Sequence, residues 1–184
     1  MEKQFEIESF DLKNASPAEY AAFSAFANQI RAERLPDDPP FSLEELIQRW
    51  RSIPPIVEVF QFVVRMAAKE AIIAAGDIQV SRTQDNQHLA PFNIAVLPQF
   101  RRLGLARRLL AEHVSVAQRE NRRLMITQTN ERTPAGESFM HRLGAEKGLE
   151  GHTNQLKISE VDRNLVQQWQ ARAAERAAGF ELGF

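Results

Sequence analysis

The segment that most constrains the fold of this chain extends from Leu89 to Ala106. An apolar stretch that ends in Val96-Leu97-Pro98 predicts a buried strand, and apolar residues at helical spacing after Phe100 predict a helix. Only a short basic turn with one glycine, Gly104, separates the two. Such a turn leaves the first N–H groups of the helix unpaired and directed at one place. The segment therefore predicts an anion site, suited to phosphate or pyrophosphate, at the start of the helix.

The residues of this turn strengthen the prediction only in part. Gly104 allows a ligand to approach the backbone closely. Four arginines would add positive charge and charge-assisted donors: Arg101, Arg102, Arg107 and Arg108. The phosphate-binding patterns G-x-G-x-x-G and G-x-x-x-x-G-K-[ST] are both absent, and a single glycine is a weak signal. From the turn alone, a solvated strand, turn and helix without a ligand is an equally good interpretation.

Capping patterns and alternation predict the remaining elements. Ser16-Pro17-Ala18-Glu19 and Ser42-Leu43-Glu44-Glu45 are capping boxes, so a helix begins at each. Thr133-Pro134 predicts a further helix that stops at Gly144. Strands are expected at residues 5–10, 56–67, 71–82, 89–96 and 124–129, and as a hairpin-like pair over 145–159. Because strands and helices do not alternate strictly, the order predicts an α+β domain with a mixed sheet flanked by helices.

Composition excludes several classes of protein. Cysteine is absent, which excludes a disulfide framework, a thiol nucleophile and cysteine-ligated metals, and which suits the cytoplasm, where we expect this chain. The four histidines have no metal-ligand spacing, so no metal is expected. The sequence contains neither a signal peptide nor 18 consecutive apolar residues, so no membrane partner is expected. A net charge of −1 argues against a nucleic-acid partner.

Two segments together carry a resemblance to a known family. Arg101-Arg102-Leu103-Gly104-Leu105-Ala106 fits the pattern R/Q-x-x-G-x-G/A, with Val96-Leu97-Pro98 before it as V-x-P. The segment Phe139 to Ala145 contains the end of a helix followed by Leu-Gly, similar to a downstream L-G-F motif. In these motifs, and in the order of elements over residues 5–159, the sequence resembles the GNAT superfamily of acetyl-CoA-dependent N-acetyltransferases. The resemblance implies a mostly antiparallel sheet, splayed between the strand that ends at Val96 and the one that begins at Leu124.

The resemblance also implies an activity and a cofactor site. Acetyl-CoA would be the co-substrate, and a primary amine of a small molecule or peptide would attack it directly. The N–H groups of about Arg102 to Arg107 would hold the pyrophosphate, and the strand before the turn would pair with the pantetheine arm. The N–H of Val96 would polarise the thioester carbonyl, which makes it the implied catalytic group. The cofactor-binding residues implied in this way are Ile94, Ala95, Val96, Arg101, Arg102, Leu103, Gly104, Leu105, Ala106, Arg107 and Thr133.

The proton-transfer groups are less well defined. Met140 stands where the family usually has a tyrosine acid, and methionine cannot protonate a thiolate. Thr133 replaces a frequent asparagine, although its hydroxyl can still cap the helix. His88 is a candidate base because histidine is a common general base in enzymes, and an ordinary histidine at a strand edge is the simpler interpretation. Glu58 is a second candidate, against a solvated strand face. His113 is expected to be a surface residue.

The end of the chain allows two interpretations. Residues 161–178 predict an amphipathic helix and residues 180–184 alternate like a strand, so we divide the chain into a domain at 1–159 and an extension at 160–184. The extension either packs on the same domain or resembles the linker of two-domain, mycothiol-synthase-like GNAT proteins. In the second case the chain is an N-terminal half, or a short relative that forms a homodimer through this helix and strand.

The charge distribution and the missing acid give two hypotheses for function. Residues 1–50 carry five Lys and Arg against ten Asp and Glu, a net charge of −5, and residues 101–123 carry seven Arg against two Glu, a net +5. This polarity suits an anionic cofactor and an ammonium substrate, and chance clustering on solvated faces explains it equally well. The leading hypothesis is an amine N-acetyltransferase. The alternative is a catalytically silent acyl-CoA-binding or interaction module, which Met140 favours.

Overall fold

The computed structural model describes residues 5–66, 69–152, 154 and 156–180. Contacts between Cα atoms divide the chain into two compact units, Met1–Gly144 and Ala145–Phe184. No helix in the described part of the chain is both long enough and apolar enough to cross a lipid bilayer.

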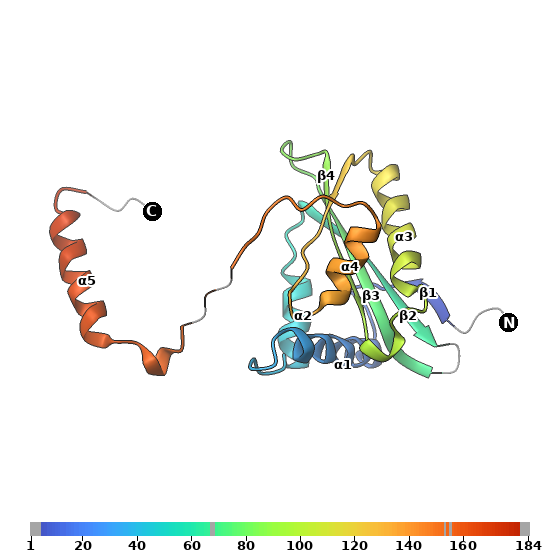
Figure 1. The fold of residues 1–184 in the computed structure, drawn as a ribbon, viewed down its shortest axis with the longest axis horizontal. Coiled ribbons are helices and arrows are strands. Elements are labelled where there is room, and N and C mark those ends of the chain that lie inside the picture. Colours follow the sequence, from blue (N-terminus) through green and yellow to red (C-terminus); the bar gives the residue numbers. More distant parts are fainter. Residues whose placement is uncertain (1–4, 67–68, 153, 155, 181–184) are drawn as a thin grey trace. The chain divides into compact units, whose positions relative to one another are not determined.

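The first unit contains one sheet of five strands in the order β1-β2-β3-β4-β5 (Figure 1). The strands are β1 (Phe5–Ser9), β2 (Val57–Met66), β3 (Lys69–Ser81), β4 (Leu89–Val96) and β5 (Leu124–Ile126). The first four pair antiparallel, and β5 joins β4 in parallel. The structure thus confirms the α+β class and the mixed, mostly antiparallel sheet.

Helices α1 (Pro17–Arg34) and α2 (Leu43–Arg51) lie on one face of the sheet, and α3 (Leu105–Arg119) lies on the other. Helices α1 and α2 begin at the expected capping boxes, with Ser16 and Ser42 as N-caps. Apolar residues of α1 share a cluster with Val63 and Ala75 of the central strands. Helix α3 covers the opposite face, where Leu105 and Leu109 contact the neighbouring strand residues Val64 and Ala74. Successive side chains of a strand point to opposite faces, so each face has its own core.

Helix α4 (Pro134–Arg142) adds Met140 to the core on the α3 face, where it packs against a cluster that includes Ile78 and Val116. Its expected cap is not formed, because the hydroxyl of Thr133 makes no capping hydrogen bond and is buried without a partner among the described residues. Methionine at position 140 therefore has a packing role that a polar acid would not fill.

The second unit contains α5 (Arg163–Arg176), capped by Asp162, whose carboxylate accepts the N–H groups of Asn164 and Leu165. The predicted helix is confirmed. The hairpin expected over 145–159 is wrong for the residues described there, which form no strand. Apolar side chains such as Leu149 and Leu156 are exposed in this segment, so no packed face holds it extended in a sheet. The strand expected over 180–184 lies outside the described residues except for Phe180.

His113 of α3 is buried, with 0% of its surface exposed, so its prediction as a surface residue is wrong. It falls on the sheet-facing stripe of the helix with Leu109 and Val116, at steps of four and three residues. The ring lies against Gly76, where an added Cβ atom would come within 2.7 Å of His113 Cε1. Burial lowers the pKa of His113 to about 4, and the neighbouring Gly76 backbone opposes this only in part.

This buried imidazole predicts acid sensitivity of the fold. The unfolded chain protonates His113 near the ordinary pKa of 6.5, whereas the folded chain does so only near 4, so stability is fully present above pH 6.5 and is lost as the pH falls toward 4. We expect His113 to lower the free energy of unfolding by about 2 kcal/mol at pH 5 relative to pH 7.5. Urea unfolding at both pH values measures this loss. His113→Gln, which cannot titrate, should lose correspondingly less stability, and an equal loss in both proteins would contradict the assignment.

Candidate functional site

Strand β4 has an open edge along its second half. Its first residues, Leu89–Pro91, pair with Leu124–Ile126 of β5. Its last residues, Phe92–Val96, pair on the other side with Ala74–Ile78 of β3, and no second strand among the described residues pairs with them. The strands β4 and β5 therefore separate after Pro91, which is the splay that the resemblance implied.

The backbone of this edge has groups free to pair with a ligand. Leu97 N donates to Ile73 O of β3 at 3.0 Å. Because N–H groups alternate in direction along a strand, those of Ile94 and Val96 point away from β3, toward the open edge. An extended molecule with amide groups can pair there as an added strand would.

The turn after β4 presents the first N–H groups of α3. Arg102 has φ 65° and Gly104 has φ 80°, so two left-handed residues reverse the chain within four positions. The first hydrogen bond of the helix is Arg108 N to Gly104 O, at 3.1 Å. The N–H groups of residues 105–107 consequently have no acceptor among the described residues. A Cβ atom at Gly104 would have no atom within 4 Å, so the backbone is open to a ligand here. This geometry fits an anion.

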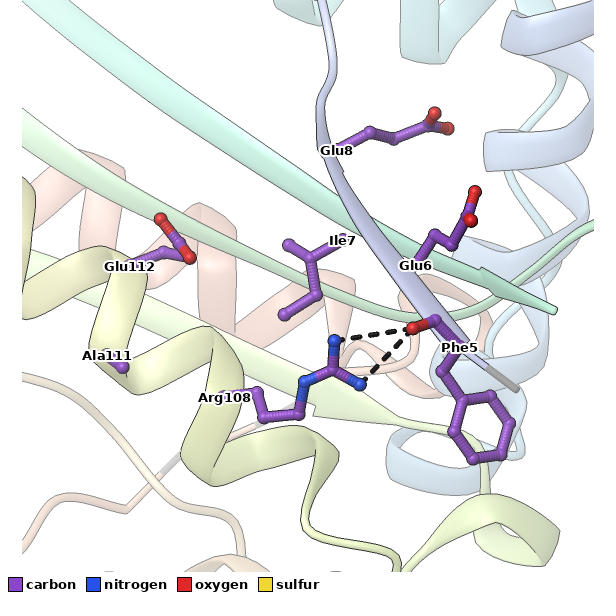
Figure 2. Close-up of a pocket in the computed structure, with 7 residues that line it drawn as sticks. All are labelled: Phe5, Glu6, Ile7, Glu8, Arg108, Ala111 and Glu112. Carbon is purple, nitrogen blue, oxygen red and sulfur yellow. Dashed lines mark hydrogen bonds between the residues drawn. The ribbon is translucent and has the colours of Figure 1, made fainter. Parts of the chain in front are cut away.

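The four arginines of the turn differ in what they contact. Arg102 and Arg107 are exposed and form no ion pair with any residue that the structure describes. Arg101 is bound to Glu33 of α1. Both terminal nitrogens of Arg108 lie 3.3 Å from Phe5 O of β1 (Figure 2). Of the four, therefore, Arg102 and Arg107 are the ones that have no ion pair or backbone contact among the described residues and can meet an anion at the turn.

Arg108 helps to line a hollow of about 500 Å³, and Figure 2 shows the residues around it. It lies between β1 and α3; Ile7 and Glu112 lie on the same side of β1 as Arg108, whereas the side chains of Glu6 and Glu8 point away from it. Strand β1 forms one edge of the sheet and β5 the other, so this hollow is at the edge opposite the splay. It does not belong to the candidate site.

The two candidate bases from the sequence are not placed beside the open edge. His88 is exposed and precedes β4, eight residues from Val96, which corresponds to about 26 Å along a strand. Glu58 forms an ion pair with Arg82, whose other nitrogen binds Glu120 at the end of α3 at 2.6 Å. Glu58 thus links β2 to the α3 face. The structure does not bring either residue to the splay.

Sequence reasoning missed Asp77, a carboxylate in the middle of the sheet. It is in register with Gln61 of β2 and Asn93 of β4, so three polar residues cross the three central strands in one row. Asn93 Nδ2 donates to both carboxylate oxygens at 3.2 and 3.3 Å, and Gln79 Nε2 donates at 3.1 Å. Burial raises the pKa of Asp77, and these hydrogen bonds offset it only in part. No described lysine or arginine pairs with it.

The position of Asp77 relates it to the open edge. Its partner Asn93 directly precedes Ile94, whose N–H faces the splay. Asp77 alternates with Ile78, which faces α3, so its side chain is on the α1 and α2 face. The signal in the sequence was a single charged residue in the otherwise uncharged run 71–80. The candidate site therefore combines a turn with unpaired N–H groups, a free strand edge and a half-buried carboxylate.

Comparison with known proteins identifies the family. The profile of the acetyltransferase (GNAT) family matches residues 26–145, so the chain belongs to this family of acetyltransferases, which use acetyl-CoA as co-substrate. No curated sequence matches the chain.

Solved structures show the same fold at low identity. The aminoglycoside N-acetyltransferase AAC(6')-Iy in complex with CoA matches with a TM-score of 0.60 and 15% identity, over 85% of this chain and 97% of that one. The protein yncA from Salmonella typhimurium with acetyl-CoA matches with a TM-score of 0.62 and 16% identity, over 85% and 87%. A tandem GNAT protein of clavulanic acid biosynthesis matches with a TM-score of 0.60 and 19% identity, over 76% of this chain and 43% of that one.

Proposed function

We propose that this chain transfers the acetyl group of acetyl-CoA to a primary amine of a small, cationic molecule by direct attack. The observation that carries the proposal is the half-buried carboxylate of Asp77, which lies on β3 directly beside the β4 strand that has the open edge. An uncharged amine must attack the thioester, and a nearby base of raised pKa is suited to removing its proton. The net charge of −5 over residues 1–50 would attract an ammonium ion.

The cofactor would lie along the groups that the fold leaves unpaired. The N–H groups of residues 105–107 and the side chains of Arg102 and Arg107 would hold the pyrophosphate. The pantetheine arm would pair with the open edge at Ile94 and Val96, and one of these N–H groups would polarise the thioester carbonyl. Such a donor stabilises the developing oxyanion and is typically worth about 3 kcal/mol.

Asp77 would take the proton of the acceptor, directly or through one water. The amine nitrogen then forms a bond to the acyl carbon, the bond from that carbon to sulfur breaks, and the thiolate leaves with a proton from water. Met140 cannot donate this proton because it has no acidic hydrogen and packs in the core on the α3 face. Positioning of amine and thioester supplies the rest of the rate.

The similar structures support a cationic acceptor. One is an aminoglycoside acetyltransferase from an uncultured soil metagenomic sample in complex with sisomicin, with a TM-score of 0.61 and 13% identity, over 84% of this chain and 97% of that one. Aminoglycosides and polyamines carry several primary amines and are cationic at neutral pH. We therefore expect members of this chemical class among the acceptors.

A screen of CoA release over aminoglycosides, polyamines, amino acids and peptides tests the function. We expect acetyl-CoA to bind in a calorimetric titration, and thiol release to depend on enzyme and on a cationic amine. Binding without release from any amine would instead favour the alternative, a silent acyl-CoA-binding module. If acetyl-CoA does not bind at millimolar concentration, both the proposed transferase function and the silent binding module are wrong.

A further inference from the structure

The side chain of Arg101 joins three elements around the open edge. Its two terminal nitrogens donate to the two carboxylate oxygens of Glu33, at 2.7 and 2.5 Å. Its Nε donates to the carbonyl oxygen of Val96 at 3.1 Å. Both charged side chains are only about a quarter exposed, at 24% for Arg101 and 23% for Glu33. One guanidinium thus connects the end of α1, the end of β4 and the start of the turn.

These contacts leave Arg101 poorly placed to bind a phosphate. Both terminal nitrogens, which a bidentate contact with a phosphate would need, already donate to Glu33, and the third nitrogen, Nε, donates to Val96 O. Arg102 and Arg107, in contrast, have no such partners among the described residues. We therefore relate the role of Arg101 to the groups that it binds, the carboxylate of Glu33 and the carbonyl oxygen of Val96.

Arg101 binds the carbonyl oxygen of Val96, which has no strand partner in the part of the chain that the structure describes. The N–H and C=O of one residue in a strand point to the same side, so Val96 O faces the open edge together with Val96 N–H. Strand β5 has already separated at this point and pairs only as far as Pro91. Arg101 supplies the hydrogen bond that β5 does not, and this fixes the last peptide groups of the edge.

Glu33 keeps Arg101 in this position. Its neighbour Arg34 is partly buried, and burial together with the charge of Arg101 lowers the pKa of Arg34. Glu33 is the anion that favours both of these cations. We therefore expect that removal of its charge would leave Arg101 and Arg34 to repel each other and would weaken the contact of Arg101 with Val96 O.

We propose that Glu33 and Arg101 form a positioning pair, which orients the end of the open edge toward the thioester and couples that edge to α1. Helix α1 covers the sheet face on which Asp77 lies, so movement of its end is transmitted to the backbone of Val96. The proposal rests on the proposed function. It predicts that the pair affects the rate of transfer more than the affinity for the cofactor.

Three substitutions separate this role from phosphate binding. Arg101→Met keeps the apolar stem, and Glu33→Gln keeps the shape without the charge. We expect each to lower kcat about ten- to a hundredfold, as misplacement of reacting groups does, with the Kd of CoA within threefold of wild type. Arg107→Met should do the opposite and raise the Kd. A tenfold rise in Kd with unchanged kcat in Arg101→Met would overturn the proposal.

A double variant tests whether the two residues act as a unit. If they do, Arg101→Met with Glu33→Gln is no slower than Arg101→Met alone. If the losses in kcat of the two single variants multiply in the double variant, the two residues do not act as a unit and the proposal is contradicted. Should Arg101→Met unfold, Glu33→Gln together with Arg101→Lys gives the same comparison, because lysine keeps the charge and cannot make the three contacts.

A measurement without an acceptor separates this proposal from the proposed function. The amide signal of Val96 in a 1H–15N spectrum should shift when acetyl-CoA binds to the wild-type chain. The shift should be reduced in Arg101→Met and in Glu33→Gln at saturating acetyl-CoA. If no amine is acetylated but this difference is seen, the function fails and the positioning pair stands. An identical shift in all three proteins would refute the pair whatever the activity.

Discussion

Gly104→Glu should abolish acetyl-CoA binding, with a Kd raised at least about a hundredfold, or about 2.7 kcal/mol. The substitution places a carboxylate at the start of α3, beside the free N–H groups of residues 105–107. A negative charge there repels the pyrophosphate and competes for the same donors. Titration calorimetry with acetyl-CoA measures the loss.

Gly104→Ala is the matched control. Alanine meets the same φ of 80°, where a side chain is strained, and a Cβ atom at this position has no atom within 4 Å to clash with. The two variants therefore share the backbone cost, and only glutamate adds the charge. We expect the Gly104→Ala variant to bind acetyl-CoA at least about ten times more tightly than the Gly104→Glu variant, because like-charge repulsion costs several kcal/mol. Unchanged affinity in Gly104→Glu would show that the cofactor site is elsewhere.

Asp77→Asn should lower kcat about a hundred- to ten-thousandfold, the usual contribution of a positioned base. Asparagine keeps the size and most of the polar contacts of the side chain but cannot take up a proton. The Kd of acetyl-CoA should stay unchanged, because Asp77 lies on the face opposite α3, in the row with Gln61 and Asn93. Asp85→Asn, at an exposed turn, is the control and should have wild-type kinetics.

The pH profile gives this prediction a second readout. Burial raises the pKa of Asp77, so its carboxyl group takes up a proton at a higher pH than an ordinary aspartate does. A protonated carboxyl group cannot accept the proton of the amine, so kcat/KM of the wild type should fall as the pH drops through this raised pKa. This fall in kcat/KM on the acidic side of the profile, the acidic limb, should be absent in Asp77→Asn. The same acidic limb in both proteins would exclude Asp77 as the proton acceptor.

Local signals in the sequence were sufficient for most of the fold. The capping boxes at Ser16 and Ser42 fix the starts of α1 and α2, because both partners of each box lie within four residues. The strand, turn and helix from Leu89 onward formed as expected for the same reason. Gly104 has a φ of 80°, in the left-handed region that glycine adopts most easily.

Contacts between distant segments could not be predicted in this way. Arg101 and Glu33 are 68 residues apart, and nothing near either residue indicates the other. Asp77 gains its raised pKa from burial in a row that three strands form together, which a single strand does not reveal. The burial of His113 is unusual for a polar residue, but its spacing of four residues from Leu109 places it on the sheet-facing stripe of α3.

The central claim is that acetyl-CoA binds along the open edge of β4 and at the start of α3, beside Asp77. A titration of the 15N-labelled chain with acetyl-CoA, followed by amide signals, tests this most directly. We predict that the largest shifts occur at Ile94 and Val96 and in the turn from Arg102 to Arg107. Shifts confined to other segments, for example to the hollow between β1 and α3, would contradict the account.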